Sequence, residues 1–325
     1  MKKVSIRTRS DSPIESVQPT LNNKPKKILI TGSTGFIGTQ LTSFLTTQGH
    51  TVIPMLRSKG GVDEKDAIFW DPAKGTVDSS KLEGLDGVIH LSGASIASRR
   101  WSEARKGIIS KSRVDSTVLL SNTLSKMRKP PKVLVCASAT GYYGDTGKTI
   151  ITERSPPGSG FLPTVSQEWE RSTKPASTAG IRVVNLRTGI VLNPLGGFLK
   201  QILPLFRLGL GGKLGNGKQY MSWILMDDLL HVVLFAINNK SVNGPINVTS
   251  PKPVTNEKFT KTLGRILSRP TMSFVPAFAI RLLYGEMGKE LVLGSCRVIP
   301  EKLMSWGFRF YYPTLEKALR HVLGK

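Results

Sequence analysis

The sequence predicts an α/β protein with a doubly wound parallel sheet and a small C-terminal α+β lobe. Two observations carry this prediction. Short apolar runs alternate with segments whose apolar residues recur at helical spacing, which is the pattern of parallel strands joined by helices. After residue 192 the sequence changes to glycine- and proline-rich stretches, and loops of this kind build substrate sites.

The elements follow one another in a regular order. Five strands are expected, at residues 27–31, 51–56, 87–91, 133–137 and 181–186. The segment between Ser102 and Leu124 predicts an amphipathic helix, whose basic residues are either solvated or in contact with a cofactor or substrate. From Asn256 onward we expect short helices and a small strand at residues 308–312.

The composition is that of a globular protein. The chain has 325 residues, of which 39% are hydrophobic, so it can bury a large core. This balance excludes disordered, collagen-like and small disulfide-rich proteins. The length suits one large domain or two modest ones.

The charge is strongly basic. Lysine and arginine number 46 against 22 aspartates and glutamates, which gives a net charge of +24. Nucleic acid, an acidic membrane face and phosphorylated ligands are all attracted by such a charge. The basic residues are scattered, and no zinc-finger, helix-turn-helix or RNA-recognition pattern accompanies them, so no nucleic-acid partner is predicted.

Residues 1–25 are expected to form a flexible basic leader. Lys2, Lys3, Arg7 and Arg9 all precede the first acid, Asp11, and the segment has no apolar signal-peptide core. This pattern indicates a mitochondrial leader, with the cytoplasm or another organellar stroma or matrix as the alternative. A disordered tail with incidental charge explains the same residues.

Three kinds of site are not expected. Cys136 lies in an apolar run and Cys296 far away, so buried reduced thiols are predicted rather than a disulfide. The four histidines lack the spacing of a zinc site, so no metal is predicted. The most apolar stretch, residues 223–237, is interrupted by Asp227 and Asp228, which predicts a helix N-terminal cap and no membrane span.

The strongest chemical signal is a glycine-rich segment between the first strand and the first helix. It consists of Gly32, Ser33, Thr34, Gly35, Phe36, Ile37 and Gly38. Glycines at this place permit a tight turn and a close approach of the backbone to a pyrophosphate, which then lies at the positive end of the helix. The segment therefore predicts a Rossmann-type dinucleotide site, with a purely structural turn as the alternative.

Arg57 follows the second strand, where an NAD-binding protein has an acid that accepts from the ribose 2′-hydroxyl. An arginine pairs instead with a 2′-phosphate, so NADP(H) is favoured over NAD(H). The alternative is an exposed loop arginine without such a role.

With these motifs the sequence resembles the extended and atypical short-chain dehydrogenase/reductases, and within them the epimerase family proteins. The resemblance runs from about Lys26 to Leu323. Its marks are Thr31–Gly38, His90–Ala94, Arg100–Lys106, Ser138–Gly144, Gly217–Gln219, Ser222–Ile224, Arg297–Val298 and Trp306–Phe308. The family's small terminal module corresponds to about residues 274–323.

The resemblance implies further cofactor-binding residues. The loop after the third strand, Leu91, Ser92, Gly93 and Ala94, is expected to line the cofactor. Arg113 stands near the position of the superfamily's helix asparagine, and Arg187 resembles an arginine after the sixth strand. Both are candidates for binding phosphate or a substrate acid, or they hold the protein together.

The resemblance also shows what is missing for catalysis. Short-chain dehydrogenases use a Tyr-x-x-x-Lys pair for proton transfer. Alignment on Glu170 places Leu162 and Ser166 at these two positions. The superfamily serine has a counterpart in Ser138, and the nearby phenols, Tyr142 and Tyr143, are either proton donors or packing residues.

The predicted organisation has three parts: the leader, an NAD(P)-binding Rossmann domain over residues 26–250 with a lobe-forming insert at about 193–222, and a small C-terminal module over 251–325. The leading hypothesis is an NADP(H)-binding oxidoreductase or epimerase-like enzyme for an unidentified small carbonyl or sugar-like substrate. The alternative is a weakly active or non-catalytic NADPH-binding structural or sensor protein. A homodimer is compatible with either.

Overall fold

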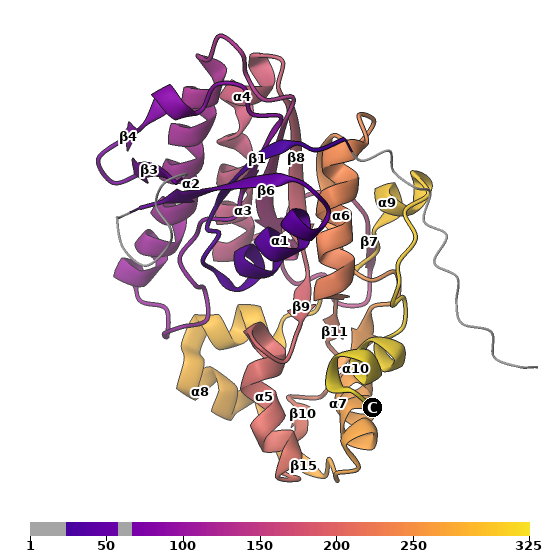
Figure 1. Cartoon of the computed structure of the whole chain (residues 1–325). Coiled ribbons are helices and arrows are strands. Elements are labelled where there is room, and N and C mark those ends of the chain that lie inside the picture. The colour runs from indigo at the N-terminus through magenta and orange to yellow at the C-terminus, as the bar shows by residue number, and fades with distance from the viewer. Residues whose placement is uncertain (1–23, 58–66) are drawn as a thin grey trace, which may run out of the picture.

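The computed structural model describes residues 24–57 and 67–325 (Figure 1). The leader proposed for residues 1–25 therefore lies almost entirely outside the described residues. Among the described residues, the larger part of the molecule is built on an eight-stranded sheet of order β13-β8-β6-β5-β1-β2-β3-β4. These strands are β1 (Lys27–Thr31), β2 (Thr51–Leu56), β3 (Ile68–Asp71), β4 (Thr76–Val77), β5 (Gly87–His90), β6 (Val133–Ala139), β8 (Arg182–Thr188) and β13 (Gly244–Val248).

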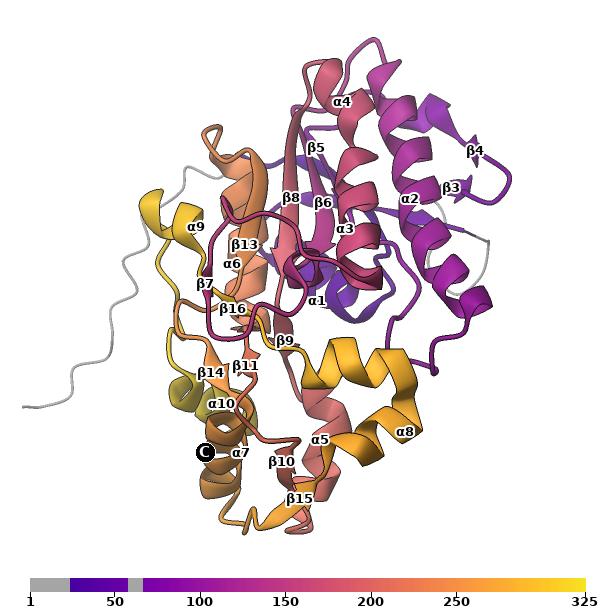
Figure 2. The same ribbon diagram turned by 180° about the vertical axis from the view of Figure 1, so that it is seen from behind.

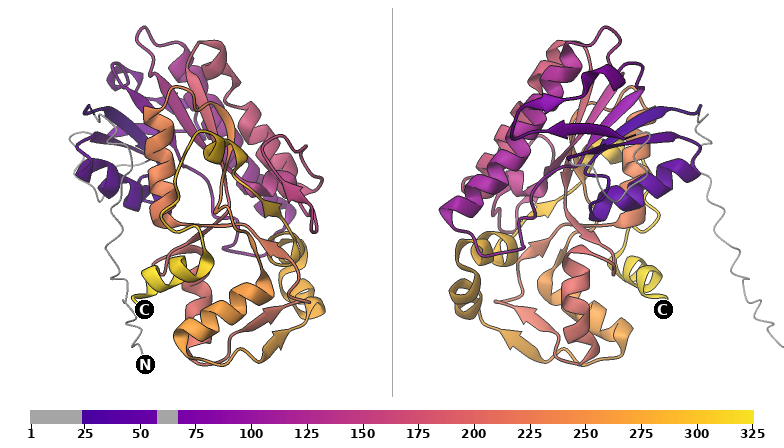
Figure 3. Two further views of the ribbon diagram at one scale, coloured as in Figure 1. Left: turned by 90° about the vertical axis from the view of Figure 1, so that its right-hand side faces the viewer. Right: turned by 60° about the vertical axis from the view of Figure 1, so that its left-hand side comes forward.

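The sheet is parallel except for the pairing of β3 with β4 at its edge. Helices cover both of its faces, as Figure 3 shows. One face is covered by α2 (Glu103–Ser125) and α4 (Lys174–Thr178), and α3 (Phe161–Arg171) lies beside α2; α1 (Phe36–Thr47) and α6 (Met226–Asn238) cover the other face. The predicted doubly wound α/β class is confirmed.

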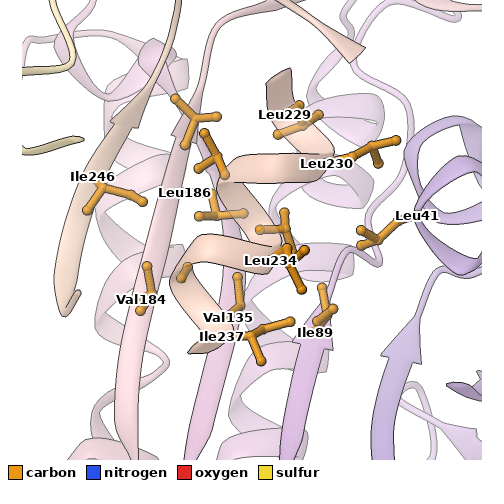
Figure 4. Close-up of a cluster of buried hydrophobic side chains, with 14 of the residues drawn as sticks. Leu41, Ile89, Val135, Val184, Leu186, Leu229, Leu230, Leu234, Ile237 and Ile246 are labelled. Carbon is orange, nitrogen blue, oxygen red and sulfur yellow. The ribbon is translucent and has the colours of Figure 1, made fainter. Parts of the chain in front are cut away.

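The core of the sheet follows from the two-residue alternation of side chains along each strand. Within β1, Ile28 and Ile30 pack toward α1 and α6, whereas Leu29 packs toward α2. Figure 4 shows the first of these clusters, in which Leu229, Leu230 and Leu234 of α6 lie over the strands. Most residues of α6 are buried, because the helix is packed between the sheet and the C-terminal segment.

A second, smaller lobe lies at the carboxyl edge of the sheet (Figures 1 and 2). It is formed by α5 (Gly197–Arg207), α7 (Asn256–Leu267), α8 (Ala277–Met287), α10 (Leu315–Leu323) and the short strands β10 (Gly212–Leu214), β11 (Tyr220–Met221), β14 (Val254–Thr255) and β15 (Ser273–Val275). Its core joins α5, α7 and α10 around Trp223, which is fully buried. The lobe thus combines the expected insert with the C-terminal module.

Several short elements complete the fold. They are η2 (Ser79–Lys81), η3 (Thr140–Tyr143), β7 (Ile150–Ile151), β9 (Ile190–Leu192), β12 (Trp223–Leu225), the π-helical η4 (Gly288–Leu293), β16 (Arg297–Val298) and α9 (Glu301–Ser305). Strand β16 pairs with β7, and Leu303 and Phe308 enter the core beneath α6. The C-terminal module is therefore anchored on the Rossmann core as well as on the lobe.

Two local predictions were wrong. Residues 308–312 form no strand, because Asp228 accepts the backbone N–H groups of Tyr311 at 2.7 Å and Tyr312 at 3.2 Å. Asp227 and Asp228 lie in the first turn of α6 but do not cap it, since Asp227 bonds His321 at 2.7 Å. Both acids hold the C-terminal segment against α6 instead.

A buried histidine joins two strand ends at the carboxyl edge. His90, the last residue of β5, is hydrogen-bonded to the hydroxyls of Thr31 at 2.7 Å and Thr117 at 3.0 Å. Thr31 in turn accepts the backbone N–H groups of Leu91 and Ser92. Burial lowers the pKa of His90 to about 3, so the imidazole is neutral in the folded protein.

This arrangement predicts a pH dependence of stability. Because the folded pKa of His90 lies below its unfolded value of 6.5, its contribution is present above pH 6.5 and is lost as the pH falls toward 3. We expect the free energy of unfolding to fall by about 1.4 kcal/mol per pH unit below 6.5 from this group alone. Urea unfolding of the wild type and of His90→Gln at several pH values checks this, and parallel curves would contradict it.

Candidate functional site

The predicted site residues come together at the carboxyl edge of the sheet. The glycine loop follows β1, Arg57 follows β2 and the loop 91–94 follows β5, while Ser138 and Arg187 lie near the ends of β6 and β8. Strand β1 has β2 on one side and β5 on the other, so the direction of the strand order reverses there. This switch point is where open α/β sheets bind their ligands.

The glycine loop has the geometry of a phosphate-binding turn. Gly32 has φ +70°, a conformation that favours glycine, and Gly35 donates its N–H to the Gly32 carbonyl at 3.0 Å. A Cβ on Gly38 would lie 2.0 Å from the Gly32 oxygen, so helix α1 can start this close only without a side chain there. Thr34 and Gly35 lie at the start of α1, whose N-terminal amides face the turn.

Two observations in this loop fit a bound dinucleotide. The hydroxyl of Ser33 is buried and has no hydrogen-bond partner among the described residues. Phe36 and Ile37 pack partly buried against the main core, which fixes α1 beneath the turn. The loop thus presents an unused donor and free helix amides at the place where the dinucleotide pyrophosphate is expected.

The loop after β5 is fixed by arginines from α2. Arg113 donates to the carbonyl of Ala94 at 3.0 Å and lies over the indole of Trp169, 5.0 Å from the ring centroid. Arg105 donates to the Ser95 carbonyl and to the Ser98 hydroxyl. Burial, followed by the charge of Arg105, lowers the pKa of Arg113 to about 10.

Neither of these arginines has a carboxylate partner among the described residues. Their positive charge is therefore uncompensated beside the expected cofactor site. Arg57 is exposed and is the last described residue before the gap at 58–66. It shares the carboxyl edge with the glycine loop, as the sequence predicted for a residue that contacts a 2′-phosphate.

Beneath the expected reactive end of the site lies a buried ion pair. Arg187 of β8 donates to both oxygens of Glu170 on α3, at 2.8 Å each. Ser138 donates its hydroxyl proton to the same carboxylate at 2.7 Å. Parallel pairing of Ser138 with Arg187 in the β6–β8 register brings these groups together.

The two adjacent tyrosines are placed differently. Tyr143 is 1% exposed, accepts from Arg187 at 2.9 Å and donates to the side-chain carbonyl of Asn247 at 2.7 Å, and burial raises its pKa to about 12. Tyr142 is half-buried, and its ring stacks on the Arg187 guanidinium at 3.5 Å. The hydroxyl of Tyr143 is thus fully engaged in the interior, which leaves Tyr142 as the better-placed phenol.

The positions that align with the tyrosine and lysine pair are closed by packing. Leu162 joins an apolar cluster with Trp101, Ile109, Met287 and Leu291, two of which belong to the C-terminal module. Ser166 is 4% exposed on the same helix. The helix therefore offers no ionisable side chain where the superfamily's proton transfer takes place.

The C-terminal module also caps this helix. Both oxygens of Glu290 accept from the first turn of α3, from the N–H of Phe161 at 3.2 Å and of Leu162 at 3.1 Å. A carboxylate at a helix N-terminus satisfies free amides and the helix dipole. Sequence analysis missed Glu290 because the contact joins residues 128 and 129 positions apart, and it used Glu170 only to align the helix.

Other expected features can be compared directly. Cys136 and Cys296 are both free thiols, as predicted, and burial raises their pKa values. Within residues 24–57 and 67–325, no group of three or more histidine, cysteine or acidic side chains is placed to hold a metal ion. No helix in the same ranges has the length and apolar content needed to cross a bilayer.

The family is shown by comparison with known proteins. The chain belongs to the NAD dependent epimerase/dehydratase family, whose model matches residues 28–249, and a domain of unknown function matches residues 275–322. An epimerase family protein of Mycobacterium tuberculosis is 41% identical over 295 residues, which cover 91% of this chain and 97% of that protein.

Two further relatives extend the comparison. The epimerase family protein SDR39U1 homolog, chloroplastic, of Arabidopsis thaliana is 38% identical over 308 residues, which cover 91% of this chain and 86% of that protein. The crystal structure of human epimerase family protein SDR39U1, isoform 2, with NADPH has a TM-score of 0.84 and 31% identity, and covers 92% of this chain and 99% of that one. The predicted family resemblance is confirmed along with the fold.

The buried ion pair predicts a large loss of stability when one partner is removed. Glu170→Ala leaves the Arg187 guanidinium buried without its carboxylate, so we expect the free energy of unfolding to fall by about 3–5 kcal/mol. The matched control is Glu257→Ala, which removes an exposed partner of Lys261 and is expected to lower the free energy of unfolding far less, because solvent screens an exposed ion pair. Urea unfolding measures both, and similar losses for the two variants would contradict the assignment.

Proposed function

We propose that the protein binds NADP(H) and is a slow oxidoreductase or epimerase-like enzyme for a small carbonyl or sugar-like substrate. The single observation that carries the cofactor half is the glycine loop, with its left-handed Gly32, its close contact at Gly38 and its unpartnered Ser33 hydroxyl at the β1–β5 switch point. The NADPH in the human relative's crystal structure supports the same cofactor here.

The proposed cofactor-binding residues divide by location. The loop 32–38 holds the pyrophosphate through backbone amides, and Arg57 pairs with the 2′-phosphate. The loop 91–94, which Arg113 holds through the Ala94 carbonyl, lines the opposite side of the cofactor. Bound at this edge, the cofactor supplies a hydride donor or acceptor.

The reactive half is proposed from the groups that remain near the ends of β6 and β8. Ser138 is 5% exposed and donates its hydroxyl proton to Glu170, so toward a substrate its oxygen serves only as an acceptor. Tyr142 supplies the phenol. It is the tyrosine nearest to Ser138 in sequence, and its hydroxyl is not held in the interior as that of Tyr143 is. Arg187 holds this arrangement from below through Glu170 and the Tyr142 ring.

A non-catalytic NADPH-binding protein is the second candidate, and a specific observation favours it. Leu162 stands at the position aligned with the superfamily's tyrosine and is packed among apolar side chains of α2 and the C-terminal module. No other ionisable pair takes the place of the tyrosine and lysine at these positions of α3. In that case the cofactor stabilises the protein, or the protein senses the cofactor. Either function leaves the cofactor proposal unchanged.

The localisation proposal rests on the sequence alone. A mitochondrial leader in residues 1–25 is proposed from the early basic residues, with the cytoplasm or another organelle as the alternative. The name of the Arabidopsis relative assigns that protein to the chloroplast. Microscopy of residues 1–25 fused to a fluorescent protein distinguishes these compartments.

Cofactor preference is the first test. Purified protein is expected to bind NADPH more tightly than NADH, and Arg57→Ala to narrow the difference, because the guanidinium neutralises the extra phosphate. Gly35→Val is the non-binding control, since a Cβ there meets only the Gly32 oxygen at 3.2 Å and the side chain blocks the pyrophosphate. Titration calorimetry measures all affinities, and equal affinities for the two cofactors in the wild type would remove the role of Arg57.

The two tyrosines give the test of chemistry. Once a substrate is found, Tyr142→Phe should lower kcat by about 10²- to 10⁴-fold, the usual contribution of a general acid or base. Tyr143→Phe should mainly lower thermal stability, since it removes the buried bond to Asn247. Turnover is measured at the nicotinamide absorbance with NADPH binding checked in parallel, and an unaffected Tyr142→Phe enzyme would mean that water or the substrate carries the proton.

A further inference from the structure

The lobe exposes an unusual run of apolar side chains that extends from the segment before β15 into α8. Between residues 272 and 284, seven large apolar residues are exposed: Met272, Phe274, Val275, Phe278, Leu282, Leu283 and Tyr284. Met272 is 92%, Phe278 71% and Leu282 72% exposed. Scattered exposed apolar residues are common on proteins, but a contiguous run of this length marks an interaction surface.

Helix α8 presents this surface in a regular way. Phe278, Arg281 and Leu282 are exposed at helical spacing, and Ile280 and Met287 are buried on another side of the helix. The outward face of α8 is therefore apolar with a cation in its middle. Such a face is the reverse of the polar outer face expected of a helix on a water-exposed surface.

The end of α5 continues the surface. Leu205, Leu208 and Leu210 are exposed there, and β10 just after them pairs with β15. Gly209 approaches the ring of Pro270, which places the two segments side by side. Figures 1 and 2 show β15 and the end of α5 together at the far end of the lobe, with α8 to the side of α5. These three leucines and the seven residues of 272–284 are called the apolar tip below.

Positive charge lies beside the part of the apolar tip formed by the end of α5 and by β15. A hollow of about 380 Å³ next to it is lined by Arg207, Leu267, Arg269, Leu323 and Lys325. Among the described residues, neither Arg207 nor Arg269 takes part in an ion pair. Lys213 lies 5.8 Å above the ring of Phe274.

The nearby acids are already engaged. Glu286 pairs with Lys106 at 3.0 Å, and Glu290 accepts from the amides at the start of α3. Exposed apolar side chains therefore lie beside two arginines, Arg207 and Arg269, that form no ion pair within the part of the chain that the structure describes. The whole chain reinforces this field with its net charge of +24.

We propose that the apolar tip docks on an anionic phospholipid membrane. Protruding Phe, Leu and Met side chains enter the interface between headgroups and acyl chains, and the cations of the basic hollow bind the lipid phosphates. A second copy of the chain fits less well, because a symmetric contact would bring the same cations against each other. The attachment is peripheral and does not depend on the proposed function.

The test is sedimentation of the full chain with lipid vesicles. We expect the wild type to bind vesicles that contain about one third phosphatidylglycerol, to bind pure phosphatidylcholine vesicles at least tenfold more weakly, and to lose binding as salt is raised. Two double variants test the two parts of the surface. One combines Phe278→Ser with Leu282→Ser, and the other combines Arg207→Glu with Arg269→Glu. Each should weaken vesicle binding about tenfold or more. Thermal melts establish that each variant is folded.

Matched controls carry the same changes elsewhere. Ile108→Ser removes an exposed apolar side chain of α2, and Lys240→Glu reverses an exposed charge after α6, and both should bind like the wild type. The proposal is overturned if the wild type does not bind anionic vesicles, if lipid charge makes no difference, or if the controls lose as much affinity as the tip variants. It is also overturned if light scattering shows a dimer that the Phe278 and Leu282 variant dissociates, since the tip is then a contact between copies.

Discussion

The ion pair between Arg187 and Glu170 is the interaction on which the reactive end of the site depends. It connects strand β8 with helix α3, and the same carboxylate fixes the Ser138 hydroxyl. The guanidinium supports the Tyr142 ring and the Tyr143 hydroxyl. Because both charges are buried, each needs the other, and a change in any of these groups alters the rest.

The network continues from Tyr143 into the C-terminal module. Asn247 accepts from Tyr143 and donates to the carbonyl of Ile299, and Glu153 accepts the backbone N–H groups of Asn247 and Lys302. The module also contributes Glu290 to the start of α3 and Met287 to the cluster around Leu162. The module therefore borders the candidate site, and it packs against Leu162, which the alignment on Glu170 places at the superfamily's tyrosine position.

The two halves of the site are consequently unlike. The cofactor half has a standard turn, free amides and uncompensated arginines, all of which suit an anionic dinucleotide. The proposed substrate half has Leu162 and Ser166 at the positions aligned with the superfamily's tyrosine and lysine, together with Ser138, the half-buried Tyr142 and the ion pair of Arg187 with Glu170.

The sequence by itself determined the fold class, the family and the glycine loop, because each depends on local patterns: strand and helix periodicity, and glycine at positions that exclude a side chain. The family resemblance also pointed to Ser138, Arg113 and Arg187, of which Ser138 and Arg187 lie near the ends of β6 and β8. Only the tertiary structure decided what these residues do. Glu170, Glu290 and Asp228 meet their partners across long stretches of chain, and the strand expected at 308–312 is absent because Asp228 takes its amides. Hydrogen bonds of this kind depend on which elements pack together, and no local pattern in the sequence specifies that.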